Sequence, residues 1–225
     1  MDYELWPLGD RALLLRFGDS ACIETNRLVH RACAAISHAG LQGVRACAPA
    51  YAALVLDLDL PMLARHGGTV ALKEQLQALL APLDAAKAES TPRVRDIPTR
   101  YGGEDGPDLA EVAERTGLSA KQVIDVHAGT LYRVAMTGFQ PGFPYLLGLP
   151  EALHLPRRSS IRSSVPAGSV ALAGAQTGIY PASSPGGWHL IGRTALSLFD
   201  CQRQPEVWLQ PGDAVRFVPV AVARD

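Results

Sequence analysis

The stretch SVALAGAQTGIYPASSPGGWHLIGRT, residues 169–194, decides the fold of the second half of this 225-residue chain. Its short apolar runs are separated by glycine, proline and serine, which are the residues that turns require. The same texture begins near Tyr132 and extends almost to the end of the chain, with apolar runs at 132–139, 168–173, 178–180, 188–192, 196–199 and 214–218. Many short strands separated by turns are typical of a β-barrel or a β-sandwich.

A domain boundary is predicted upstream of these strands. Residues 84–92, DAAKAESTP, are small and polar and end at a proline, so we place the linker there. This gives an N-terminal domain of residues 1–90 and a C-terminal domain of residues 91–225. Two short helices at 107–115 and 120–128 precede the strands of the C-terminal domain, with Asp108 and Ser119 as their N-terminal residues.

The N-terminal domain alternates between strand and helix patterns. A strand, a helix, two strands and a helix are predicted at 11–17, 23–39, 44–49, 52–58 and 70–83, and a strand at 94–99, just beyond the predicted linker, could close the set. The order β-α-β-β-α-β predicts a small ferredoxin-like α+β layer. The fold class of the whole chain is therefore α+β.

The composition excludes several classes of protein. With 21 basic and 22 acidic residues the net charge is −1, which favours neither a nucleic acid nor an anionic membrane as a partner. No apolar run approaches the roughly 20 residues of a membrane helix, and the N-terminus has no signal-peptide pattern, so we expect a cytoplasmic protein. Neither the four cysteines nor the six histidines show metal-ligand spacing, so we expect no metal and reduced thiols.

Residues 138–145, GFQPGFPY, form a conspicuous aromatic loop. The loop lacks the lysine of a phosphate-binding G-x-x-x-x-G-K-[ST] loop, and its prolines remove backbone N–H groups that a phosphate would need. Two interpretations stay open. The loop is either a rigid structural element, or a wall of a binding cleft to which Phe139, Phe143 and Tyr145 contribute apolar area.

Polar side chains stand among the glycines of residues 169–194. Gln176, Tyr180, His189 and Arg193 could converge on a small polar ligand, although the glycines could instead serve barrel corners and bulges. His189 is the candidate catalytic base, because the ordinary pKa of histidine is near neutrality; a purely structural histidine is the alternative. Neighbours in a strand point to opposite faces, so we expect His189 to face the cleft and Trp188 to pack inside.

A small basic cluster lies between the aromatic loop and the glycine-rich stretch. Arg157, Arg158 and Arg162 form either a solvated loop or a clamp for a carboxylate or a phosphate, since arginine makes bidentate bonds to both.

Five segments together resemble one known family. They are YGGEDGPDL (101–109), GFQPGFPYLLGLP (138–150), PRR (156–158), VPAGSVALAGAQTGIYPASSPGGWHLIGRT (165–194) and PGDAVRFVP (211–219). They resemble, in order, the B subunit of 5-oxoprolinase, whose family is also called the KipI family or allophanate hydrolase subunit 1. PLGDRALLLRFGD (7–19) resembles the start of that family, so the resemblance covers nearly the whole chain.

The resemblance implies a small N-terminal α+β domain followed by a cyclophilin-like β-barrel domain. It implies ATP-dependent hydrolysis of 5-oxo-L-proline to L-glutamate, a lactam opening, by a complex in which this chain is inactive alone. The implied partners are the 5-oxoprolinase C subunit, of the allophanate hydrolase subunit 2 family, and its A subunit, of the LamB/YcsF family. Because the chain shows no nucleotide motif, ATP is expected at the level of the complex.

Within that activity the chain is expected to hold the lactam. Gln176 or glycine-rich backbone would meet the lactam oxygen, and Arg158 or Arg193 the carboxylate. Three alternatives remain open: a regulator that inhibits a sensor histidine kinase, a component of a urea- or amide-carboxylating and allophanate-hydrolysing system, and a prolyl isomerase suggested only by the barrel.

Overall fold

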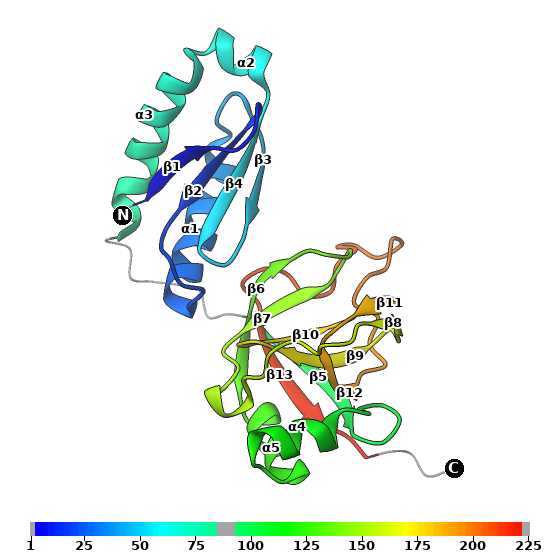
Figure 1. Cartoon of the computed structure of the whole chain (residues 1–225). Helices are drawn as coiled ribbons and strands as arrows, with labels where there is room; N and C mark the ends of the chain where they lie inside the picture. Colours follow the sequence, from blue (N-terminus) through cyan, green and yellow to red (C-terminus); the bar gives the residue numbers. More distant parts are fainter. Residues whose placement is uncertain (1–2, 85–92, 222–225) are drawn as a thin grey trace. The chain divides into compact units, whose positions relative to one another are not determined.

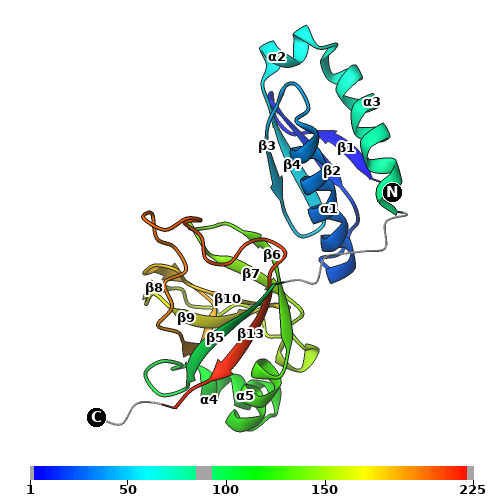
Figure 2. The ribbon, with the colours of Figure 1, turned by 180° about the vertical axis from the view of Figure 1, so that it is seen from behind.

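The computed structural model describes residues 3–84 and 93–221, and the chain divides into two compact units, Met1–Thr91 and Pro92–Asp225. Each unit has a hydrophobic core of its own. Nearly all of the predicted linker at 84–92 lies outside the described residues. Figures 1 and 2 show the two units from opposite sides.

The N-terminal unit is an antiparallel sheet with helices packed on one face. The sheet has the order β1-β2-β4-β3, from β1 (Glu4–Pro7), β2 (Ala12–Arg16), β3 (Val44–Pro49) and β4 (Ala53–Leu58). The helices are α1 (Ile23–Ala39), α2 (Leu60–Arg65) and α3 (Gly68–Leu80), followed by the short η1 (Ala81–Asp84). Alternate leucines of β2 and β4 share one core with the apolar stripes of α1 and α3, which places both helices on the same face. Figure 2 shows α1 lying across the sheet.

One predicted strand belongs elsewhere. Residues 94–99 were expected to close the N-terminal sheet, but β5 (Val94–Tyr101) lies in the other unit, between β12 (His189–Arg193) and β13 (Ala214–Pro219). The edge position beside β2 is occupied by β1 instead. Since β1 has four residues and is mostly exposed, its sequence has no alternating pattern by which to recognise it.

The C-terminal unit contains a closed barrel of the order β10-β7-β6-β13-β5-β12-β9, which confirms the predicted barrel. Its remaining strands are β6 (Leu131–Thr137), β7 (Pro144–Leu147), β9 (Ser169–Ala173), β10 (Gln176–Ile179), β12 (His189–Arg193) and β13 (Ala214–Pro219). An antiparallel pair of strands that are not consecutive in the chain, β8 (Arg162–Val165) and β11 (Ser184–Gly186), forms a second small sheet. The predicted strand at 196–199 is wrong: only an isolated bridge from Phe199 to Val207 forms there.

Two helices, α4 (Leu109–Thr116) and α5 (Ala120–Ala128), close one end of the barrel. Ser119 begins α5 with a reciprocal capping box to Gln122, as its position predicts. Asp108 stands at the N-terminus of α4, but its side chain makes no capping bond and is used elsewhere. A short turn, η2 (Glu151–Leu153), completes the unit. No helix within residues 3–84 and 93–221 is long and apolar enough to cross a membrane.

A chain of buried polar groups crosses the barrel core. The Tyr101 hydroxyl lies 2.7 Å from Nδ1 of His127, and Nε2 of His127 lies 3.0 Å from Oγ1 of Thr177. Thr177 donates its own proton to the carbonyl of Ala171, so His127 must donate to Thr177 and accept from Tyr101. Burial lowers the pKa of His127 to about 3, which agrees with this neutral form.

Candidate functional site

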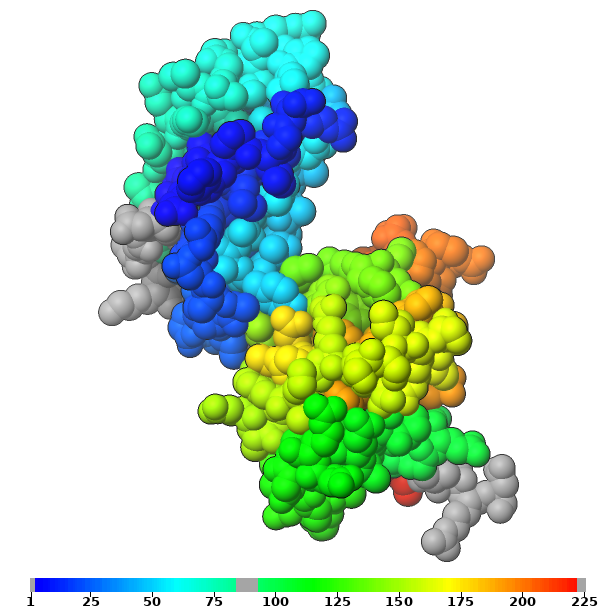
Figure 3. Space-filling view, viewed as in Figure 1, coloured from blue at the N-terminus to red at the C-terminus, as the bar shows by residue number. Residues whose placement is uncertain are grey.

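The C-terminal unit contains a cavity of about 440 Å³. Its walls come from the aromatic loop, from β7, from the segment between η2 and β8, and from the chain on either side of β11. They are formed by Phe139, Phe143, Tyr145, Arg157, Arg158, Ser159, Ile161, Tyr180, Pro185, Gly186, Gly187 and Trp188. In the space-filling view the yellow chain around residues 155–170 forms a broad part of the visible surface, next to the green of α4 and α5 (Figure 3).

Aromatic rings form most of the apolar wall of this cavity. Phe143 lies at the centre, with ring centroids 4.8 Å from Tyr145, 5.2 Å from Tyr180 and 5.6 Å from Trp188. The contacts with Tyr180 and Trp188 are edge-to-face, which is a favoured arrangement of aromatic pairs. The rings therefore hold one another in place and give the cavity a preformed apolar surface.

Phe139 is held at the mouth of the cavity by a strained turn. Its φ is +66°, and the N–H of Gln140 donates to the carbonyl of Gly138 at 2.8 Å, closing a three-residue turn around it. Such turns are rare for residues with a side chain. The ring remains 63% exposed while it packs edge-to-face on Phe143. Strain of this kind is concentrated at functional sites, so we count Phe139 as part of the site.

Two glycines make room for these rings. A Cβ at Gly178 would lie 3.0 Å from Phe143 and 3.1 Å from Trp188, and a Cβ at Gly186 would lie 2.4 Å from the Tyr180 hydroxyl. The glycine-rich stretch was expected either to form a ligand site or to serve the architecture of the barrel. Here its glycines allow the aromatic rings to pack closely, and this packing forms the wall of the cavity.

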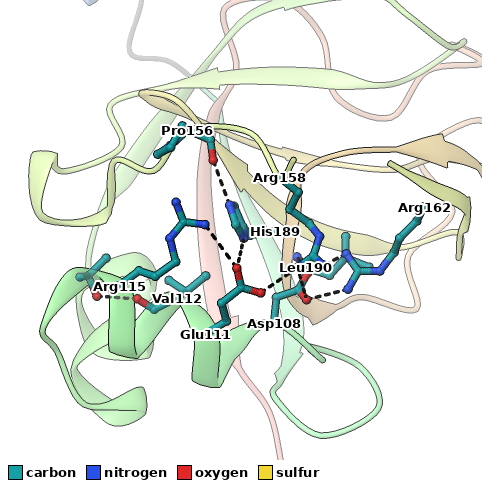
Figure 4. A network of polar contacts seen from close by, with 10 residues as sticks. Asp108, Glu111, Val112, Arg115, Pro156, Arg158, Arg162, His189 and Leu190 are labelled. Atoms are coloured by element: carbon teal, nitrogen blue, oxygen red, sulfur yellow. Dashed lines mark hydrogen bonds and ion pairs between the residues drawn. The ribbon is translucent and has the colours of Figure 1, made fainter. Parts of the chain in front are cut away.

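A buried carboxylate fastens the basic segment of the cavity wall to the barrel. Asp108, 4% exposed, accepts bonds from Arg158 at 3.0 Å and from both terminal nitrogens of Arg162 at 2.9 and 2.6 Å. The backbone N–H of Leu190 in β12 donates to the same carboxylate at 2.7 Å. Figure 4 shows how these groups converge from the start of α4, from β8 and the segment before it, and from β12.

Glu111, one turn further along α4, extends the network to His189. It accepts from Arg158 at 2.8 Å and from Arg115 at 3.3 Å. Partial desolvation opposes ionisation, but the hydrogen bonds from these two arginines lower the pKa of Glu111 on balance. Nε2 of His189 lies 2.9 Å from the Pro156 carbonyl, and its Nδ1, 3.9 Å from Glu111, has no hydrogen-bond partner among the described residues.

The structure brings together some of the predicted site residues and separates others. Phe139, Phe143, Tyr145, Tyr180 and Arg158 line the cavity. Gln176 begins β10, four residues before Tyr180, and Arg193 donates to the Ala167 carbonyl; neither lines the cavity.

His189 does not line the cavity, against expectation, whereas Trp188 is buried as expected and also forms part of the cavity wall. Trp188 lines the cavity, whereas the His189 side chain is fully buried against Pro156. We expected a polar side chain to avoid the interior, but the interior here offers a carbonyl and a nearby carboxylate. A catalytic role for His189 stays a prediction.

Sequence reasoning did not assign Trp188, Ser159 or Ile161 to the site, and it gave Asp108 only a helix-start role. A carboxylate whose arginine partners lie about fifty residues away along the chain leaves no local pattern. Among the described residues no group of three or more histidine, cysteine, aspartate or glutamate side chains could hold a metal ion.

Residues 3–209 match the family described as carboxyltransferase domain, subdomain C and D. The 5-oxoprolinase B subunit from Bacillus subtilis strain 168 is 42% identical over 97% of this chain and 93% of its own length. This chain belongs to the family of 5-oxoprolinase B subunits. The member from Escherichia coli O157:H7 is 56% identical over 65% of this chain and 66% of its own length.

Among solved structures, that of TTHA0988 superposes on 95% of this family member with a TM-score of 0.81 and 41% identity. The present chain spans 40% of the TTHA0988 chain, so the larger protein carries this fold together with further sequence.

Proposed function

We propose that this chain is one subunit of an ATP-dependent 5-oxoprolinase, which hydrolyses 5-oxo-L-proline to L-glutamate together with partner subunits. The observation that carries the proposal is the likeness to the Bacillus subtilis relative along almost the full length of both chains. The partners would be the C subunit, of the allophanate hydrolase subunit 2 family, and the A subunit, of the LamB/YcsF family. The chain alone would be inactive.

The part played by this chain would be to bind the lactam in the aromatic cavity. A five-membered lactam is a small ring with polar groups at its edge, and the cavity is lined by aromatic rings together with arginine and serine side chains. Binding in a preformed site lowers the entropic cost of the reaction that follows.

The polar side chains that the sequence suggested for substrate contact are engaged in other bonds, lie outside the cavity or are buried. One terminal nitrogen of Arg158 already donates to Asp108 and Glu111, and Nε of Arg193 donates to a backbone carbonyl. Gln176 does not line the cavity, and the His189 side chain is buried. We therefore assign binding to this chain and expect the base that activates water to come from a partner subunit.

We do not assign ATP to this cavity. A triphosphate is held by several backbone N–H groups, a lysine and a metal ion, and the sequence has no such phosphate loop. Five of the twelve residues that line the cavity are instead aromatic. We propose that ATP binds elsewhere in the complex and assign no step of its chemistry to this chain.

Two further expectations belong to this proposal. The N-terminal unit would be a variant of the ferredoxin-like layer in which β1 takes the edge position, and the barrel would be cyclophilin-like. A cytoplasmic location would suit Cys22, Cys33, Cys47 and Cys201, which are free thiols.

The proposal is tested by omission. The chain and the two proposed partners are purified separately and mixed, and ATP hydrolysis is measured with and without 5-oxo-L-proline. We expect oxoproline-dependent hydrolysis only when all three are present. Full activity without this chain would contradict the proposal.

A further inference from the structure

We infer that Arg157 is the anchor for the carboxylate of the ligand that binds in the aromatic cavity. The inference deepens the proposed function, because it rests on the cavity being the substrate site. It also replaces Arg158 and Arg193, the two arginines that the sequence suggested for this role.

The three arginines of the basic segment are not equivalent. Arg158 and Arg162 are tied to buried Asp108, and Arg158 also to Glu111. Among the described residues, no carboxylate pairs with Arg157, which is exposed and lines the cavity. Asp108 and Glu111 therefore compensate the charges of Arg158 and Arg162, and the charge of Arg157 remains for a ligand.

The guanidinium of Arg157 shares the cavity with two tyrosine side chains, Tyr145 and Tyr180. Burial raises the pKa of Tyr145 and of Tyr180, and the positive charge of Arg157 opposes that rise at both residues. Arg157, Tyr145 and Tyr180 all line the cavity, so the guanidinium and the two phenols border the same space. An arginine with neighbouring O–H donors suits a carboxylate, which accepts several charge-assisted hydrogen bonds.

The aromatic walls of the cavity favour a carboxylic acid that contains a ring. Phe143, Tyr180 and Trp188 present an aromatic surface against which a compact apolar ring can pack. A polyphosphate would be served poorly by one unpaired arginine, because phosphate sites gather several donors. Both features suit 5-oxo-L-proline, the substrate of the proposed function, which is a small ring with one carboxylate.

Binding to the full chain tests the anchor directly. The indole N–H resonances of the three tryptophans, Trp188 among them, are followed by NMR during titration. The probes are 5-oxo-L-proline, its carboxamide and 2-pyrrolidinone. For the wild-type chain we expect binding of the acid to exceed that of both neutral lactams by about ten-fold or more, the size of a charge-assisted contact.

Arg157→Gln and Arg193→Gln form the matched pair of variants, since both remove a guanidinium from the surface of the same unit. We expect Arg157→Gln to bind the acid no better than the carboxamide, and Arg193→Gln to behave as the wild type. Equal loss in both variants, no loss in Arg157→Gln, or no binding of the acid by the wild-type chain would overturn the inference.

The omission assay separates this outcome from that of the proposed function. An active three-protein complex in which Arg157→Gln leaves the KM for 5-oxo-L-proline unchanged would refute the anchor and keep the function. Selective binding of the acid by a chain that supports no oxoproline-dependent ATP hydrolysis would refute the function and keep the anchor.

Discussion

At the residue scale, His127 shows how burial sets the protonation of a side chain. It is buried in the barrel core and hydrogen-bonded on both ring nitrogens. Its pKa is lowered to about 3, whereas a histidine in the unfolded chain titrates near 6.5. Between these values the unfolded chain binds the proton and the folded chain does not, so stability is full above about pH 6.5 and falls as the pH drops toward 3.

We therefore predict that His127→Gln removes part of the acid sensitivity of the fold. The wild type should lose up to about 1.4 kcal/mol of unfolding free energy per pH unit across that window through this residue. The free energy of unfolding of the wild type and of His127→Gln is measured in urea between pH 7 and pH 4. This range covers most of the interval between the unfolded and folded pKa values of His127, and the slopes of free energy against pH are compared. The exposed His154 supplies the control His154→Gln, and equal slopes for wild type and His127→Gln would contradict the account.

The site was predictable from sequence where residue type alone decided placement. Phe139, Phe143, Tyr145 and Tyr180 are large aromatics among turn residues, and they line the cavity. His189 was misplaced because its partners, a carbonyl and a carboxylate, come from distant segments. Long-range polar pairing of this kind leaves no signal in a single sequence.

At the scale of elements, one carboxylate joins α4, β8 and β12. Asp108 receives two arginines and a backbone N–H at a position that is 4% exposed. Because removing one partner leaves buried charges unpaired, the cost is much larger than for a surface pair. The cavity wall carrying Arg157 and Arg158 is attached to the barrel through this contact.

Asp108→Asn should lower the unfolding free energy by roughly 3 kcal/mol and loosen the segment between η2 and β8. The matched control is Asp96→Asn, which breaks the two hydrogen bonds to Arg216 at an exposed position and should cost less than about 1 kcal/mol. Denaturant unfolding gives both energies, and hydrogen exchange reports the segment. Equal costs for the two variants would show that Asp108 has no special anchoring role.

The barrel was predictable as a class because its strands are short and separated by turn residues. Which strands belong to the barrel was not fully predictable. The pattern of β5 suits either sheet, and only its pairing, parallel to β13 and antiparallel to β12, assigns it to the barrel. Pairing is decided by contacts between distant segments, which an alternating pattern does not specify.

At the scale of the whole molecule, the chain joins a helix-covered sheet to a barrel whose cavity is built from ring packing and one buried ionic network. We propose that the lactam binds in the cavity and that catalysis requires an assembly of subunits. It follows that filling the cavity should abolish turnover without preventing the chain from folding or assembling.

The most direct measurement uses Gly187→Leu in the reconstituted complex. Gly187 lines the cavity, and a Cβ there would lie no closer than 3.6 Å to another group, so the added side chain occupies the cavity at little cost to the fold. Gly18→Leu, in the other unit, is the control, since a Cβ there meets its nearest neighbour at 3.4 Å. Oxoproline-dependent ATP hydrolysis is measured together with Tm and with co-elution of the subunits.

The account predicts that Gly187→Leu lowers kcat/KM for 5-oxo-L-proline by about a hundred-fold or more, with Tm and assembly unchanged, while Gly18→Leu keeps wild-type turnover. A folded, assembled Gly187→Leu complex with near-wild-type turnover would contradict the claim that the substrate is bound in this cavity.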